Sequence, residues 1–214
     1  MSRHWPVSRG GRFIQLAVGL LIAATGIWLS IRADLGVASW EVLHIALADR
    51  LGIGVGTASI GVGVLLVTIV ALLGVRPGAG TLLNVLIIGV ALNVLLDLPA
   101  LASLPSDGLP VRLAALAAGI VVFAIGCAIY VGAHLGSGPR DGLMLAVHLR
   151  TGLGIGPARI LSEGIGLATG WLLGGPAGLG TVLFVLTAGP CVAIAFKALG
   201  LRPLAPTSPH AAAC

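Results

Sequence analysis

The chain has 214 residues, of which 57% are hydrophobic and 9% are charged, and its mean hydropathy is +1.11. Soluble domains carry about 25% charged residues, so this composition excludes a soluble fold, which would lack a water-compatible surface. The net charge of +5 does not indicate a nucleic-acid partner, because the twelve Lys and Arg residues stand singly between long apolar runs. We therefore expect an integral membrane protein whose main partner is the lipid bilayer.

Six apolar stretches approach the length that crosses a bilayer. A spanning helix needs about 20 apolar residues, because the hydrocarbon core is about 30 Å thick and each residue adds about 1.5 Å. The first stretch is too long for the core of a signal peptide, so we expect it to be retained. The expected spans are residues 13–31, 57–74, 81–98, 111–133, 157–174 and 181–200.

The placement of Lys and Arg predicts the orientation, because these residues are retained on the cytoplasmic side. A cytoplasmic N-terminus puts most cations near the inner face and leaves Arg32, Arg50 and Arg112 near the outer one. The expected inner cations are Arg3, Arg9, Arg12, Arg76, Arg140, Arg150, Arg159, Lys197 and Arg202. The acids expected outside are Asp34, Glu41, Asp49, Asp97 and Asp107. We predict a multi-pass protein of the bacterial inner membrane with both termini in the cytoplasm.

The chain contains an internal repeat with an offset of 100 residues. Residues 33–60 align with residues 133–160 without a gap, and 27 of the 79 positions from 11 to 89 are identical to their partners. Chance matching in such a composition would give on the order of a tenth of positions. With three spans in each half, the second half starts on the opposite side of the membrane, which predicts an inverted repeat.

The expected fold is therefore all-α, a helix bundle of about six transmembrane helices in two inverted three-helix repeats with short interfacial or re-entrant helices. The first repeat covers residues 1–110 and the second covers residues 111–202. Residues 203–214 are rich in Pro and Ala and are expected to form a disordered cytoplasmic tail.

A short helix is predicted between the first and second spans of each half, over residues 39–50 and 139–150. Each presents an acid and a histidine on one stripe, Glu41 with His44 and Asp141 with His148. Arg140 precedes the second acid. One interpretation is a re-entrant half-helix whose polar stripe faces a solute, and the other is an amphipathic helix lying at the interface with its polar face in water.

The fifth span carries an acid, Glu163, at a depth where an ionisable group is costly and is a functional candidate by default. Arg159 lies four residues earlier on the same face, so the two residues could instead form a structural i, i+4 pair. Asn84 and Asn93 in the third span are more typical of hydrogen bonds between helices than of ligand contacts. The candidate solute-binding residues are thus Glu41, His44, Arg140, Asp141, His148, Arg159 and Glu163.

Several segments together resemble a known family of bacterial membrane proteins. These are LGVASWEVLH, GIGVGTASI, RPGAGTLLN, GSGPRDGLM, and the run from Arg159 and Glu163 through GWLLGG to GLGTVLF. They are similar to the YczE/YyaS/YitT family over residues 12 to 200. The resemblance implies a multi-pass membrane location, in a family without an established biochemical activity.

We expect a small-solute transporter or permease, and the alternative is a non-transporting membrane accessory or scaffold protein for a partner complex. No arrangement of Ser, His and Asp, no His-Glu-x-x-His and no Cys cluster is present in the sequence, so no enzymatic activity, catalytic residue, metal site or cofactor is predicted. The sequence leaves open the solute, and whether the protein forms an oligomer or binds another protein.

Overall fold

The computed structural model describes residues 8–136 and 138–201, and this part of the chain is all-helical. It has eight α-helices and one short 3-10 turn, η1. Their bounds are α1 Arg9–Ala33, α2 Ser39–Leu51, α3 Val55–Leu72, α4 Ala79–Asp97, η1 Leu104–Ser106, α5 Leu109–Val131, α6 Pro139–Thr151, α7 Ile155–Leu172 and α8 Leu179–Leu199. All six expected spans and both expected short helices are present as helices, with ends that differ by a few residues. The predicted tail at 203–214 lies outside the described residues.

Five of these helices, α1, α3, α4, α5 and α8, are long and apolar enough to cross a membrane. The fifth expected span, residues 157–174, corresponds to α7, which is as long as α3 but less apolar, because it contains Arg159 and Glu163. Large apolar side chains are exposed on the outside of the bundle, for example Leu72, Ile160 and Leu172. Such a surface suits lipid and not water.

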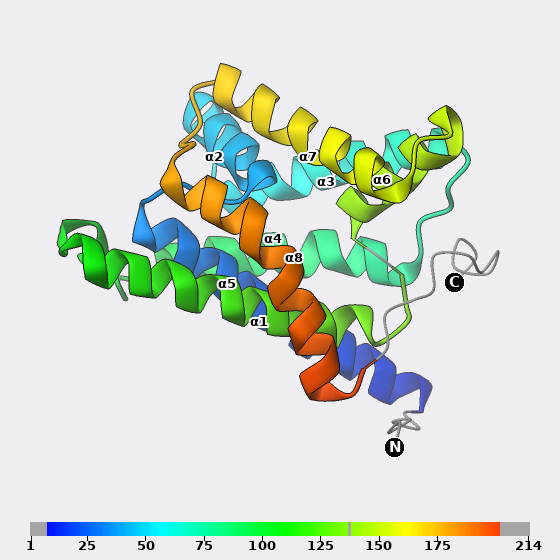
Figure 1. Cartoon of the computed structure of the whole chain (residues 1–214), viewed down its shortest axis with the longest axis horizontal. Helices are drawn as coiled ribbons and strands as arrows, with labels where there is room; N and C mark the ends of the chain where they lie inside the picture. Colours follow the sequence, from blue (N-terminus) through cyan, green and yellow to red (C-terminus); the bar gives the residue numbers. More distant parts are fainter. Residues whose placement is uncertain (1–7, 137, 202–214) are drawn as a thin grey trace.

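The helices form two layers (Figure 1). In one layer, α1 packs along α5, with α4 against α1 and α8 against α5. In the other layer, α2 packs on α7 and α6 packs on α3. Each short helix therefore packs on a long helix of the other half as well as on the long helix that follows it, α2 on α3 and α6 on α7.

The antiparallel pair α1 and α5 is in close backbone contact through glycines of both halves. A Cβ atom on Gly26 would lie 2.3 Å from the backbone N of Phe123, and one on Gly126 would lie 2.3 Å from the backbone N of Ala23. Real Cβ atoms do not approach backbone atoms so closely, so only glycine fits. Gly26 and Gly126 are partners in the sequence repeat, and their contacts are reciprocal.

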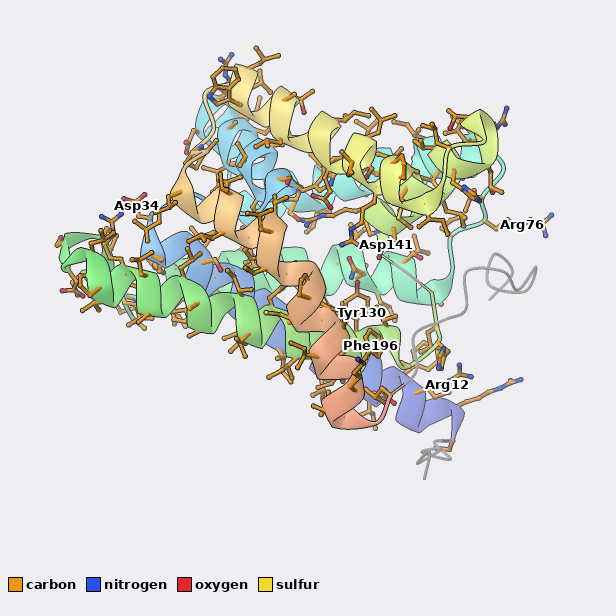
Figure 2. The ribbon with its side chains drawn as sticks, viewed as in Figure 1. Arg12, Asp34, Arg76, Tyr130, Asp141 and Phe196 are labelled. Carbon is orange, nitrogen blue, oxygen red and sulfur yellow. The ribbon has the colours of Figure 1, made fainter. Side chains whose placement is uncertain are left out.

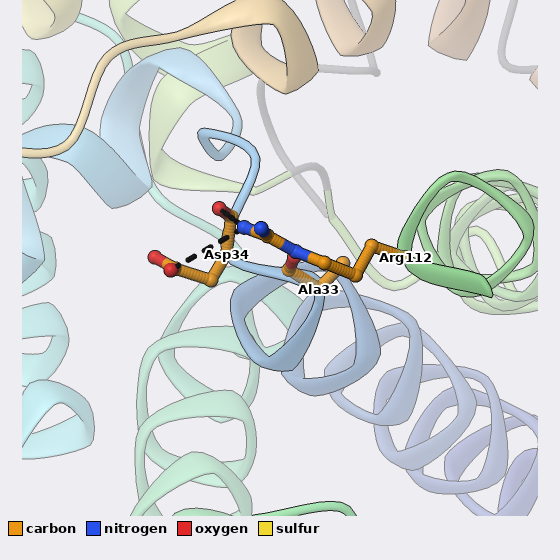
Figure 3. Close-up of polar contacts among 3 residues, drawn as sticks. All are labelled: Ala33, Asp34 and Arg112. Atoms are coloured by element: carbon orange, nitrogen blue, oxygen red, sulfur yellow. Dashed lines mark hydrogen bonds and ion pairs between the residues drawn. The ribbon is translucent and has the colours of Figure 1, made fainter. Parts of the chain in front are cut away.

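The loops at the helix ends show the same reciprocity. An arginine of each half binds the backbone carbonyl at the end of the opposite helix, and the two arginines are 100 positions apart. Arg12 donates from Nε to the carbonyl of Ala133 at 2.8 Å, and Arg112 donates from Nε to the carbonyl of Ala33 at 2.9 Å (Figure 3). The guanidinium of Arg112 also contacts the carboxylate of Asp34 at 3.4 Å. These cations therefore bind the carbonyls that helices α5 and α1 leave unpaired at their C-terminal ends.

The loop after α5 also carries His134, which is adjacent to one of these arginines. Burial lowers the pKa of His134, and the neighbouring Arg12 guanidinium lowers it further. The lowered pKa favours the neutral form of His134, which does not repel Arg12. Its backbone carbonyl accepts a hydrogen bond from Arg12 at 2.9 Å.

The α1–α5 contact gives a stability prediction. Gly26→Ala should lower the free energy of unfolding by about 1–3 kcal/mol, because the new methyl group meets backbone atoms that cannot move independently. Unfolding in mixed detergent micelles, followed by tryptophan fluorescence, measures this loss.

Gly164→Ala on α7 is the matched control, since a Cβ there has nothing within 4 Å. It should cause no loss of stability. Equal stability of the Gly26→Ala and Gly164→Ala variants would contradict the close packing of α1 on α5.

Candidate functional site

A cavity of about 180 Å³ lies between the two helix layers. Its wall contains residues from both halves of the sequence, and Figure 2 places Asp141 and Tyr130, two of them, near the centre of the molecule. The polar residues of the wall are His44, Ser59, Asn84, Tyr130, Arg140, Asp141, Arg159 and Glu163, with Cys127 beside them. The rest of the wall is apolar.

The first turns of α2 and α6 meet at an ion pair beside this cavity. The guanidinium of Arg140 binds both carboxylate oxygens of Glu41, through Nη2 to Oε1 and through Nη1 to Oε2, the latter at 3.3 Å. The Glu41 side chain is 2% exposed and that of Arg140 is 27% exposed. A two-pronged, buried pair of this kind is stronger than a surface pair and fixes the relative orientation of its two groups.

This pair corrects the side assignment made from the sequence. Glu41 was expected near the outer face and Arg140 near the inner face, but the two are in direct contact. The positive-inside rule describes charges in loops outside the membrane. It does not apply to charges at the start of short helices that run back into the protein interior.

The burial of α2 contradicts one part of the interfacial interpretation, namely that the polar face of this helix lies in water. Glu41 is 1% exposed and His44 is 3% exposed, so the polar stripe of α2 faces protein and not water. Trp40, on the same turn, packs against α7, where a Cβ on Gly166 would lie 2.7 Å from its ring. Of this stripe, His44 lines the cavity, and Glu41 lies behind Arg140.

His44 lines the cavity one turn after Glu41, and its Nδ1 atom is buried without a hydrogen-bond partner. A buried polar atom in this state normally costs about 1–3 kcal/mol. Since the atom belongs to a side chain of the cavity wall, a bound molecule could satisfy it. This unpaired nitrogen makes His44 a candidate ligand contact.

Two further carboxylates line the cavity. Asp141, in the first turn of α6, accepts a hydrogen bond from the backbone N–H of Gly138 at the start of its own helix. Glu163 of α7 accepts a hydrogen bond from the hydroxyl of Ser39, in the first turn of α2. Glu163 therefore connects α7 to the same helix start that carries Glu41.

Arg159 and Glu163 both line the cavity, but they do not pair with each other. Among the described residues the ion pairs are Arg112–Asp34 and Arg140–Glu41. The structural i, i+4 pair considered from the sequence is therefore absent. Arg159 is exposed and Glu163 is partly buried, so both are accessible from the cavity.

The structure brings six of the seven predicted residues together and leaves out His148. Glu41 stands behind Arg140, and the other five line the cavity. The ring Nδ1 of His148 instead lies 2.5 Å from the carbonyl of Leu153, just beyond the end of α6. In α2 the histidine of the predicted stripe lines the cavity and the acid does not, whereas in α6 the acid lines it and the histidine does not.

The sequence interpretation missed Tyr130 and Ser59, and it placed Asn84 among the interhelical hydrogen-bond donors. All three line the cavity. Asn93 does bond across α3 and α4, to the hydroxyl of Thr57 at 2.9 Å. Tyr130 could have been identified from the sequence, since it is the single tyrosine of the chain and lies within an apolar span.

Comparison with known proteins places the chain in a family. Residues 10–197 match the model of a family of unknown function, DUF6198. The chain belongs to that family. No solved structure matches this DUF6198 member at a significant level.

Curated relatives of this DUF6198 chain include three bacterial proteins. The membrane protein YczE of Bacillus subtilis is 36% identical over 174 residues, which cover 80% of this chain and 79% of YczE. A Haemophilus influenzae protein is 33% identical over 191 residues, covering 89% of this chain and 86% of its own. YyaS of B. subtilis is 27% identical over 179 residues, covering 83% of this chain and 89% of YyaS. The resemblance to YczE and YyaS proteins is thereby confirmed, and with it a membrane protein.

The ion pair between the short helices gives a second stability prediction. Glu41→Gln should lower the free energy of unfolding by about 3 kcal/mol, because it leaves the Arg140 guanidinium without its anionic partner in a buried position. The same micelle unfolding assay measures it.

Asp34→Asn is the control, since it removes a carboxylate from the Arg112 pair, in which the Asp34 side chain is 64% exposed. An exposed pair contributes at most about 1 kcal/mol. Losses of the same size in both variants would show that Glu41 is not buried against Arg140.

Proposed function

We propose that this DUF6198 protein is a permease that moves a small solute across the membrane through the cavity between its two helix layers. The observation that carries the proposal is a ring of ionisable side chains from both halves around one cavity inside a bundle of apolar helices. Ionisable groups are expensive at this depth and are characteristic of solute or ion pathways. The proposed role requires binding and release of a solute and no covalent step, so it is not enzymatic.

We further propose that the two halves form an inverted repeat of six spans, in which α7 crosses the membrane in addition to the five apolar helices. Helix α7 can cross despite Arg159 and Glu163 if these face the cavity and not lipid. The reciprocal contacts of Gly26 with Phe123 and of Gly126 with Ala23 are those expected of a two-fold relation between halves. In this arrangement α2 and α6 are re-entrant half-helices, and both termini lie in the cytoplasm of a bacterium.

Alternating access follows from this architecture. The first turns of α2 and α6 meet near the cavity, and each helix packs on a long helix of the opposite half. A rocking movement of one half against the other would move the two helix starts relative to each other and open the cavity to one side at a time. The Glu41–Arg140 pair lies at that junction.

The inverted arrangement predicts which side of the membrane each loop faces. Cysteines placed at Arg76 and at Ala177, both exposed in the matching loops after α3 and α7, should react with a membrane-impermeant maleimide from opposite sides. The measurement uses spheroplasts and inverted vesicles, in a background where Cys127, Cys191 and Cys214 are replaced by Ser. Labelling of both positions from one side would rule out the inversion.

Transport itself is tested in liposomes that contain the purified protein and a panel of radiolabelled small solutes. Asp141→Asn and Glu163→Gln should each reduce flux at least about tenfold, since each removes a charge from the cavity wall. Asp97→Asn, at an exposed position at the end of α4, is the matched control and should transport normally.

Wild-type flux in Glu41→Gln, Asp141→Asn and Glu163→Gln variants would remove these residues from the mechanism. The competing role, a membrane accessory protein, would be favoured by a partner recovered at fixed stoichiometry by cross-linking in native membranes, together with no flux of any solute.

A further inference from the structure

The charges around the cavity come close to cancelling. Two guanidinium groups, of Arg140 and Arg159, face three carboxylates, of Glu41, Asp141 and Glu163. The start of each of the helices α2 and α6 adds about half a positive charge, from the dipoles of its peptide groups. With His44 neutral, the net charge around the cavity is roughly zero.

An electroneutral cavity in a low-dielectric bundle disfavours any solute with a net charge. A buried net charge costs several kcal/mol unless a partner compensates it. Glu41 is already bound by Arg140, and Asp141 already caps α6. These internal carboxylates occupy the positions at the helix starts where an anionic solute would otherwise bind.

The remaining charged groups of the cavity wall include one cation and one anion that do not pair with each other. Arg159 and Glu163 line the same cavity, one turn apart on α7, without an ion pair between them. His44 offers a buried, unpaired Nδ1 in the same wall. A molecule with a negative and a positive end can bind all three at once, whereas an apolar molecule would leave them unsatisfied.

We infer that the cavity binds a small zwitterion that carries a carboxylate and a protonated amine. The carboxylate binds the guanidinium of Arg159, and the ammonium group binds the carboxylate of Glu163. The 180 Å³ volume admits a molecule of amino-acid size. The inference rests on the proposed function only for its transport consequence, because binding can be measured without flux.

The test is thermal unfolding of the purified wild-type protein in detergent at constant ionic strength. The panel contains the zwitterions glycine, β-alanine and γ-aminobutyrate, the cation methylammonium and the anion acetate. A ligand that binds the native state raises the unfolding midpoint in a concentration-dependent manner. At least one zwitterion should raise the midpoint at concentrations where methylammonium and acetate do not.

Two variants test the assignment of the ends. Arg159→Gln and Glu163→Gln should each raise the concentration of zwitterion needed for half the shift at least about tenfold, since each loses one charged contact. Arg159→Lys and Glu163→Asp keep the charge and should retain part of the affinity. Asp97→Asn should behave as the wild type.

Each other outcome overturns the inference. Methylammonium binding that tightens in Arg159→Gln would indicate a cation site, and acetate binding that tightens in Glu163→Gln would indicate an anion site. No shift with any zwitterion also contradicts it. A shift of the unfolding midpoint by a zwitterion, without flux of any solute, would support the binding site and contradict the permease. Flux of another solute, without a shift by any zwitterion, would support the permease and contradict the binding site.

Discussion

The buried pair of Glu41 and Arg140 is the interaction on which the arrangement of the site depends. Charges inside an apolar bundle are stable only when they are paired or reach water, so this pair holds two helix starts together. Helix α2 comes from the first half of the chain and α6 from the second. Their meeting point brings carboxylates and guanidinium groups from both halves to one cavity.

The short helices connect the two halves of the chain, because each packs on long helices of both halves. Since α2 packs on α7 and α6 packs on α3, one helix layer is built from interleaved pieces of both halves. The other layer is held by the close approach of α1 and α5 at their glycines. The cavity lies between these two layers, and its wall includes Arg140 and Asp141 in the first turn of α6 and His44 of α2.

Much of the fold could be predicted from the sequence, because long apolar runs are visible locally and the repeat at 100 residues is visible when the sequence is aligned with itself. All predicted helices are present, and the acids at 41, 141 and 163 gather at the cavity. The packing of α2 on α7 and of α6 on α3 could not be predicted, since helical periodicity says which face is apolar and not which helix covers it.

The predictions for His148 and Arg140 were wrong because each depends on contacts that the local sequence does not reveal. The face of α6 that carries His148 was inferred from spacing, but the end of the helix turns at Gly152 and His148 instead contacts the carbonyl of Leu153. Arg140 was assigned to the inner face because Lys and Arg in loops are retained on the cytoplasmic side. Its carboxylate partner lies 99 residues away in the sequence, and no local pattern identifies such a partner.

The central claim, that Glu41 and Arg140 join the two halves inside the bundle, is tested most directly by a thermodynamic double-mutant cycle. The free energy of unfolding would be measured for the wild type, Glu41→Gln, Arg140→Gln and the double variant. Direct contact predicts a coupling energy of at least about 1 kcal/mol, with the double variant more stable than the sum of the single losses implies. A coupling energy near zero would mean that the two side chains do not meet, and the cavity described above would lose its defining contact.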